Sequence, residues 1–296
     1  MAWMLAALLA ACGQRSGAAP QILADDVVTI GAFDFPESEL LARLYGMALE
    51  HAGFRVDLQL SLGPRELVEP ALERGLIELL PEYAGSALGF FGDEVPTSGQ
   101  RATHDALAAA ARDRGLVALA AAPAKDQNGF VVTAETAQLY GLQKVSDLAP
   151  YATHLTFGGP TECPSRPLCL EGLRSVYGLS FAGFVPLDAG GPLTIAALHS
   201  GQIDVGLLFT TDGAIDAEGF VPLRDDRHLQ PAENVTPVVR PEVLTAFGPR
   251  LADVVNAVSA ALTTKDLRAM NAEIAGGASP TGVARTWVDS HDLRTD

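Results

Sequence analysis

The 296-residue chain is poor in the residues and motifs that mark enzymes and metalloproteins. It has three cysteines and six histidines, and the histidines are scattered without the short spacings that metal sites use. Gly-x-Ser-x-Gly, His-Glu-x-x-His, Walker and Gly-x-Gly-x-x-Gly motifs are all missing. The sequence therefore predicts no metal, no cofactor and no enzymatic activity, with an enzyme on an α/β scaffold as the remaining alternative.

Basic residues are also scarce, since 20 Lys and Arg oppose 36 Asp and Glu and give a formal net charge of −16. Such a chain repels nucleic acid phosphates and anionic headgroups, so nucleic acid is excluded as a partner. The acidity either keeps the protein soluble or mildly favours cationic solutes. An apolar content of 48% in a chain of this length is enough for two domains with buried cores.

The N-terminus carries the longest apolar run and ends in Leu-Ala-Ala-Cys at Cys12. Twelve residues are too few to span a bilayer, but this pattern is typical of a lipoprotein signal peptide, here residues 1–12, whose Cys12 takes the lipid. No Lys or Arg precedes the run, which departs from that pattern and leaves an ordinary N-terminal segment as the alternative. Residues 13–25 are then expected to be a flexible tether to the membrane, with the protein extracytoplasmic.

Cys163 and Cys169 lie close together in a segment that also contains two prolines. In an exported protein such a pair predicts a disulfide loop, and two free buried thiols are the alternative.

Apolar periodicity predicts alternating strands and helices. Residues 27–33 form a strand that runs into Pro36, a residue favoured in the first turn of a helix. A strand over 54–60 and a helix over 64–74 follow, and residues 249–262, 264–275 and 280–290 are predicted to be helical. This order predicts a mainly parallel sheet covered by helices.

An internal echo supports two similar lobes. The segment ALERGLIEL at 71–79 matches ALHSGQIDV at 197–205, so that Gly75 and Gly201 lie 126 positions apart. Both read as a helix, a glycine stop and a strand that begins beside an acid. The alternative is a chance similarity between residues that commonly end helices and begin strands in α/β proteins.

Three segments resemble the marker segments of the glycine betaine, choline and osmoprotectant substrate-binding proteins of ABC importers. They are GAFDFPESELL at 31–41, LLPEYAGSA at 79–87 and FTTDG at 209–213, and the likeness extends from about Val27 to the C-terminus. The resemblance implies a type II periplasmic-binding fold, a two-lobed α/β architecture with a discontinuous first lobe and a double crossover hinge. It implies lobe 1 over 26–128 plus 236–296 and lobe 2 over 129–235.

The same resemblance implies a set of ligand-binding residues. Tyr83 lies in the matching Pro-Glu-Tyr motif, and its ring would attract a quaternary ammonium, which cannot donate a hydrogen bond. The further candidates are a second ring, hydrogen-bonding side chains at the cleft and an imidazole, namely Phe130, Ser86, Asn128, Ser38, Asp212 and His104. Five of these residues have a structural alternative: Tyr83 and Phe130 as core rings, Ser38 as an ordinary serine early in a helix, Asp212 as a turn cap, and His104 as a solvated helix residue.

The chain departs from the family in its count of rings. Relatives usually contribute about four aromatic side chains, whereas the matched positions here supply two, worth about 4 kcal/mol at most, or about millimolar affinity.

Taken as a whole, the resemblance predicts a monomeric solute receptor that serves a permease and ATPase and captures a zwitterionic or quaternary ammonium compound. A different small polar solute, or a receptor coupled to a sensor, remains open.

Overall fold

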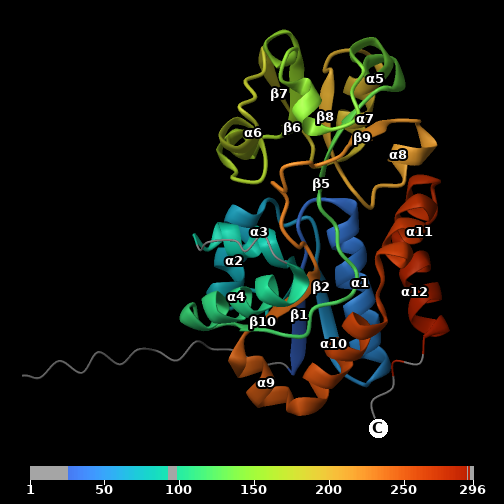
Figure 1. Ribbon diagram of the computed structural model, residues 1–296. Helices are drawn as coiled ribbons and strands as arrows, with labels where there is room; N and C mark the ends of the chain where they lie inside the picture. Colours follow the sequence, from blue (N-terminus) through green and yellow to red (C-terminus); the bar gives the residue numbers. More distant parts are fainter. Residues whose placement is uncertain (1–25, 93–98, 292, 294–296) are drawn as a thin grey trace, which may run out of the picture.

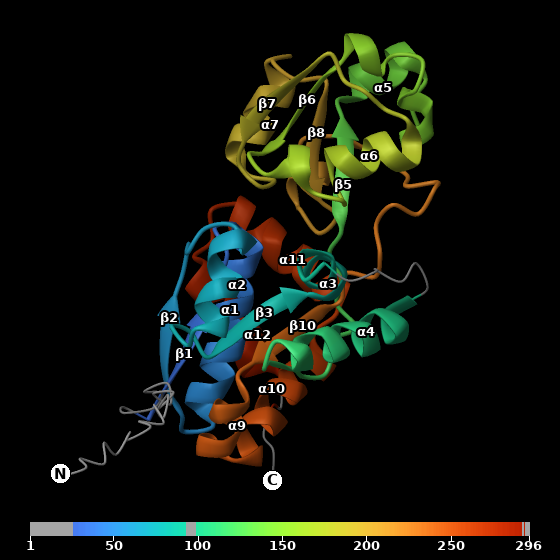
Figure 2. The same ribbon diagram turned by 90° about the vertical axis from the view of Figure 1, so that its left-hand side faces the viewer.

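The computed structural model describes residues 26–92, 99–291 and 293, which fold into two lobes (Figure 1). The predicted lipid attachment at Cys12 and the predicted tether lie outside the described residues. Each lobe contains one five-stranded sheet flanked by helices, and the two lobes are stacked one above the other in both views (Figures 1 and 2). This two-lobed α/β architecture confirms the predicted fold class.

The first sheet has the strand order β2-β1-β3-β10-β4. Its strands are β1 (Val27–Gly31), β2 (Arg55–Gln59), β3 (Leu79–Tyr83), β4 (Val117–Ala118) and β10 (Val235–Val239). Strands β1, β2 and β3 are parallel, whereas β10 runs antiparallel to both β3 and β4. The discontinuity of this lobe follows directly, because β10 returns to the sheet from beyond the second lobe.

Eight helices among the described residues belong to this lobe: α1 (Pro36–His51), α2 (Arg65–Glu73), α3 (Ala84–Phe90), α4 (Gly99–Asp113), α9 (Pro241–Phe247), α10 (Pro249–Ala261), α11 (Thr264–Ala275) and α12 (Pro280–Ser290). One hydrophobic core lies between the sheet and α1, α10, α11 and α12, and another lies under α2, α3 and α4. The three predicted C-terminal helices are confirmed to within one residue, while α9 was not predicted.

The second sheet has the order β7-β6-β8-β5-β9. It comprises β5 (Asn128–Val132), β6 (Thr156–Pro160), β7 (Gly183–Leu187), β8 (Val205–Phe209) and β9 (Val221–Leu223). The α-helices of this lobe are α5 (Ala134–Tyr140), α6 (Leu170–Tyr177), α7 (Pro192–His199) and α8 (Ala214–Ala217), with 3₁₀ turns at Val145–Leu148, Ala152–His154 and Cys163–Ser165. Here β5 is the antiparallel strand, so the two sheets have equivalent topologies.

The echo in the sequence marks equivalent positions of these two sheets. Before β3, the Glu78 carboxylate accepts from the Thr29 N–H at 2.7 Å, and before β8 the Asp204 carboxylate accepts from the Thr156 N–H at 2.8 Å. In each lobe the acid therefore links the start of the central strand to the neighbouring parallel strand, β3 to β1 in lobe 1 and β8 to β6 in lobe 2. The repeat reflects a shared supersecondary unit, not a coincidence of glycines.

The chain crosses between the lobes twice, and the two crossing segments lie side by side. The Asp126 N–H donates to the Glu233 carbonyl at 3.1 Å, and the Val235 N–H donates to the Ala124 carbonyl at 3.0 Å. We call these paired segments, residues 124–128 and 231–235, the hinge. A two-stranded connection of this kind permits rotation of one lobe against the other.

None of the helices in the described part of the chain is both long enough and apolar enough to cross a membrane.

Candidate functional site

A cavity of about 280 Å³ lies between the lobes beside the hinge. Its walls come from the ends of β1, β3 and β8, the start of α2, α3, the hinge and the loop closed by the disulfide. Strands β3 and β8 end there at Tyr83 and Phe209, which pair with the hinge residues Val235 and Asn128. Clefts at the carboxyl ends of parallel strands are the common ligand sites of open α/β sheets.

Aromatic rings from both lobes meet at this cavity. The Phe35 ring lies 6.0 Å from the Tyr83 ring and 4.9 Å from the Phe209 ring, measured between centroids. Phe35 and Tyr83 belong to lobe 1, whereas Phe209 ends the central strand of lobe 2. Phe33 and Phe90 also contribute to the lining. The rings therefore form a wall that is complete only when the two lobes are together.

Glu37 joins the lobes on one side of the cavity. Its buried carboxylate accepts from the Tyr83 hydroxyl at 2.8 Å, from the Asn271 amide at 2.6 Å and from the Thr211 hydroxyl. Thr211 belongs to lobe 2, and its carbonyl accepts a second bond from Asn271 at 3.1 Å. Burial raises the pKa of Glu37, although the three donated hydrogen bonds oppose that rise.

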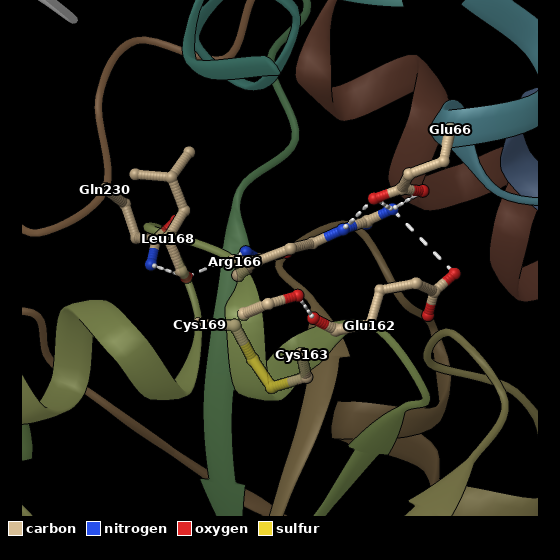
Figure 3. The surroundings of a disulfide bond; sticks show 9 residues. Glu66, Glu162, Cys163, Arg166, Leu168, Cys169 and Gln230 are labelled. Carbon is tan, nitrogen blue, oxygen red and sulfur yellow. Dashed lines mark hydrogen bonds and ion pairs between the residues drawn. A yellow bond between two sulfur atoms is a disulfide. The ribbon is translucent and has the colours of Figure 1, made fainter. Parts of the chain in front are cut away.

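Arg166 joins the lobes on another side. Cys163 and Cys169 form a disulfide with a Cα–Cα distance of 5.3 Å, and the loop between them carries Arg166 toward lobe 1 (Figure 3). The guanidinium donates to the Glu66 carboxylate at the start of α2, with Nη2 2.8 Å from Oε2 (Figure 3). The disulfide thus restricts the loop from which this interlobe ion pair is made.

Two acids of the hinge, Asp126 and Glu233, are buried against the cavity. Asp126 Oδ1 accepts from the Thr210 hydroxyl and the Thr211 N–H, both at 3.0 Å. Glu233 accepts from the N–H and the hydroxyl of Ser86, at 2.9 and 2.7 Å. Burial raises the pKa of both carboxyls, that of Glu233 to about 7, and the negative charge of Glu37 adds to the effect at Asp126.

Arg65 is the buried cation of the cavity wall. Its guanidinium donates two hydrogen bonds to the Glu82 carboxylate, from Nε and Nη2, with both N···O distances 2.8 Å. The same group lies over the Phe33 ring, 4.9 Å from the ring centroid. Glu69 is fully buried nearby, and burial together with the charge of Glu82 raises its pKa. Arg65 therefore compensates several buried carboxyl groups, namely those of Glu82, Glu69 and Glu233.

The structure brings three of the predicted ligand residues to the cavity: Tyr83, Ser86 and Asn128. Tyr83 is 5% exposed and holds Glu37 through its hydroxyl. The hydroxyl of Ser86 donates to Glu233, and the Asn128 amide donates to the Leu168 carbonyl of the disulfide loop at 3.0 Å. Both polar side chains thus organise the wall in addition to lining it.

Four predicted residues lie outside this lining. The Phe130 ring packs inside lobe 2 at 6.1 Å from the Phe157 ring, because its position on β5 faces the core. The buried Ser38 hydroxyl accepts from the Phe33 N–H at 2.9 Å. The His104 imidazole contacts the Leu119 carbonyl at 2.8 Å, and Asp212 caps the turn at the Ala214 N–H, also at 2.8 Å.

Sequence reasoning did not select Phe35, Phe209 or Asp126. Phe35 and Phe209 both lie inside the segments that carried the family resemblance, and neither was chosen as a ring. Phe209 could have been found from the echo, because it lies 126 positions after Tyr83, the spacing that separates Gly75 from Gly201. Asp126 carried no sequence signal, because its importance comes from the pairing of the hinge segments.

Comparison with known proteins agrees with this geometry. A glycine-betaine-binding protein of Pseudomonas aeruginosa is 28% identical over 284 residues, which cover 92% of this chain and 90% of that protein. The carnitine transport binding protein of Listeria monocytogenes is 26% identical over 282 residues, covering 90% of this chain and 87% of that protein.

A solved structure, described as the crystal structure of a glycine betaine/carnitine/choline ABC transporter, superposes with a TM-score of 0.71 at 26% identity. The superposition covers 90% of this chain and 99% of that one. The family model described as the substrate binding domain of ABC-type glycine betaine transport systems matches residues 26–290. Because this match spans nearly all of the described residues, the chain belongs to that family of substrate-binding domains.

Proposed function

We propose that the protein is the extracytoplasmic solute receptor of an ABC importer and that it captures a small quaternary ammonium or zwitterionic compound between its lobes. Lobe closure around the solute would present the loaded receptor to the permease and ATPase. The chain would act as a monomer that is anchored through a lipid on Cys12. Incorporation of a labelled fatty acid into the wild-type protein, and its loss in the Cys12→Ser variant, would test the anchor.

The observation that carries this proposal is the ring wall contributed by both lobes. Phe35 and Tyr83 on one side and Phe209 on the other lie around one cavity of about 280 Å³. Ring faces attract a cation with about 0.5 to 2 kcal/mol each when desolvated. Three rings supply up to about 6 kcal/mol, which corresponds to affinity in the range of tens of micromolar before other contacts are added.

Division of the rings between the lobes explains how binding could produce a signal. A ligand shifts a conformational equilibrium only by its difference in affinity for the two states. A solute held by Tyr83 alone would not distinguish an open from a closed receptor. A solute that also contacts Phe209 favours the closed receptor, because that ring is within reach only when the lobes meet.

Calorimetric titration with glycine betaine, choline, carnitine and proline betaine tests the proposal. We expect at least one of them to bind, and we expect Phe35→Leu to weaken that binding about tenfold, because leucine keeps apolar volume and removes the ring face. Phe54→Leu is the matched control, since the Phe54 ring contacts Phe247 away from the cavity. Absence of binding by all four solutes, or equal losses in the two variants, would contradict the proposed function.

A further inference from the structure

Asp126 presents one carboxylate oxygen that has no partner among the described residues. The residue is 3% exposed and lines the cavity, and its Oδ1 is already occupied by Thr210 and Thr211. Oδ2 is buried and accepts no hydrogen bond from any residue that the structure describes. An unpaired buried carboxylate oxygen is unfavourable, and a donor from a bound molecule would remove that cost.

Acidic side chains outnumber basic ones in the lining of the same cavity. The acids are Asp34, Glu66, Asp126, Glu162 and Glu233, and the bases are Arg65 and Arg166. Both guanidinium groups are already engaged, Arg65 with Glu82 and Arg166 with Glu66. Within the described lining, a carboxylate on the ligand would therefore find no unpaired guanidinium.

The hydrogen-bond donors in the first turn of α3 are also already paired with a residue of the protein. A helix start commonly offers free N–H groups to an anion, but here the Ser86 N–H and hydroxyl both donate to Glu233. The protein itself thus supplies the acceptor at this position, where an anionic group of a ligand would otherwise bind. The arrangement favours a positively charged guest over a negatively charged or zwitterionic one.

Resting on the proposed function, we propose that the ligand is a small organic cation that carries an O–H or N–H donor and no carboxylate. Its donor binds Asp126 Oδ2, and its ammonium group lies against Phe35, Tyr83 and Phe209. A hydroxylated quaternary ammonium such as choline has this chemistry. Glycine betaine does not, because its only polar group is another acceptor.

The charge balance at the hinge favours the same occupant. Burial and the neighbouring charge of Glu37 raise the pKa of Asp126, so the groups that the protein itself places around it disfavour its carboxylate form. A cation in the cavity supplies the missing positive charge and stabilises that form. Asp126 belongs to the hinge, so this contact would also link the guest to the segments about which the lobes rotate.

Four probe compounds separate the requirements of the site in calorimetric titrations of the wild-type protein. Choline supplies an O–H donor, dimethylethylammonium supplies an N–H donor, ethyltrimethylammonium supplies neither, and glycine betaine supplies a carboxylate. We expect choline or dimethylethylammonium to bind at least tenfold more tightly than both ethyltrimethylammonium and glycine betaine, since a hydrogen bond to a charged group has this magnitude.

The Asp126→Asn variant tests the assigned residue. Asparagine keeps an oxygen for Thr210 and Thr211 and places an amide donor where Oδ2 met the cavity. We expect affinity for the donor-bearing cation to fall at least tenfold further than affinity for ethyltrimethylammonium. Asp289→Asn on α12 is the control for loss of one negative charge, and thermal melting of each variant reports folding.

The outcomes separate the two proposals. If glycine betaine binds most tightly, or if choline, dimethylethylammonium and ethyltrimethylammonium bind equally, the assignment of Asp126 is overturned while the receptor function stands. If none of the four compounds binds, the assignment of Asp126 is overturned, and if carnitine and proline betaine do not bind either, the receptor function fails with it. Selective loss of donor-bearing cations in Asp126→Asn, without a change in melting, supports the assignment.

Discussion

Gly213→Ala is expected to weaken solute binding about ten- to a hundredfold while leaving each lobe folded. Gly213 lies in lobe 2 against α11 of lobe 1, and a Cβ at this position would lie 2.6 Å from Ala272 Cα. Its φ of −64° is open to any residue, so the substitution strains no backbone within lobe 2. The overlap, worth about 1 to 3 kcal/mol, arises only when the lobes are in contact.

Calorimetry of wild type and Gly213→Ala, with thermal melting beside it, measures this effect. Gly183→Ala serves as the control, because a Cβ there would meet only the Thr156 side chain, at 3.8 Å. Unchanged affinity in Gly213→Ala would mean that binding does not require the contact between the lobes. A large loss of melting temperature would instead point to a defect within one lobe.

Glu233→Gln is expected to change how stability depends on pH. The folded-state pKa of Glu233 is raised from 4.5 to about 7, chiefly because the carboxyl is buried, so the native protein holds a proton that the unfolded chain releases. The associated stability is fully present below about pH 4.5 and is lost as pH rises through about 7. The loss amounts to about 3 kcal/mol for this group.

Glutamine can keep hydrogen bonds to the Ser86 N–H and hydroxyl without titrating. The free energy of unfolding of Glu233→Gln, taken relative to wild type, should therefore rise by about 3 kcal/mol between pH 4 and pH 8. Chemical denaturation across this range measures the difference, and the other buried carboxyls cancel because both proteins contain them. A difference that is independent of pH would contradict the raised pKa.

The fold could be predicted from the sequence because its signals are local. Pro36 at the start of α1, the acids Glu78 and Asp204 before the central strands, and the capping box of α11 each act within a few residues. Gly75 and Gly201 have φ values of 72° and 68°, as expected for glycines that end helices. The two-lobed organisation then follows from the repeated unit.

The site was harder to predict because its members come from distant segments. Tyr83 could be identified within its motif, and the echo maps it onto Phe209, but nothing local brings Phe35 between them. Asn128 begins β5 at the hinge, whereas Phe130, two residues further along the same face of the strand, already lies in the lobe 2 core against Phe157. Asp126 acquires its role only through the pairing of the two hinge segments.

The polar contacts between the lobes could not be predicted from the sequence either. Glu37 lies in the first turn of α1, where an acid suits the helix dipole, and nothing in this local position indicates a contact with lobe 2. In the structure it accepts from Thr211, which is 174 positions away, and from Asn271. Contacts of this separation depend on how the lobes meet, which no pattern within one segment encodes.

A crystal structure of the protein with its tightest-binding cation tests the central claim most directly. We expect density for the ammonium group between the Phe35, Tyr83 and Phe209 rings, with a donor of the guest at hydrogen-bond distance from Asp126 Oδ2. Density for the guest on an outer face, or inside one lobe without contact to Phe209, would contradict it.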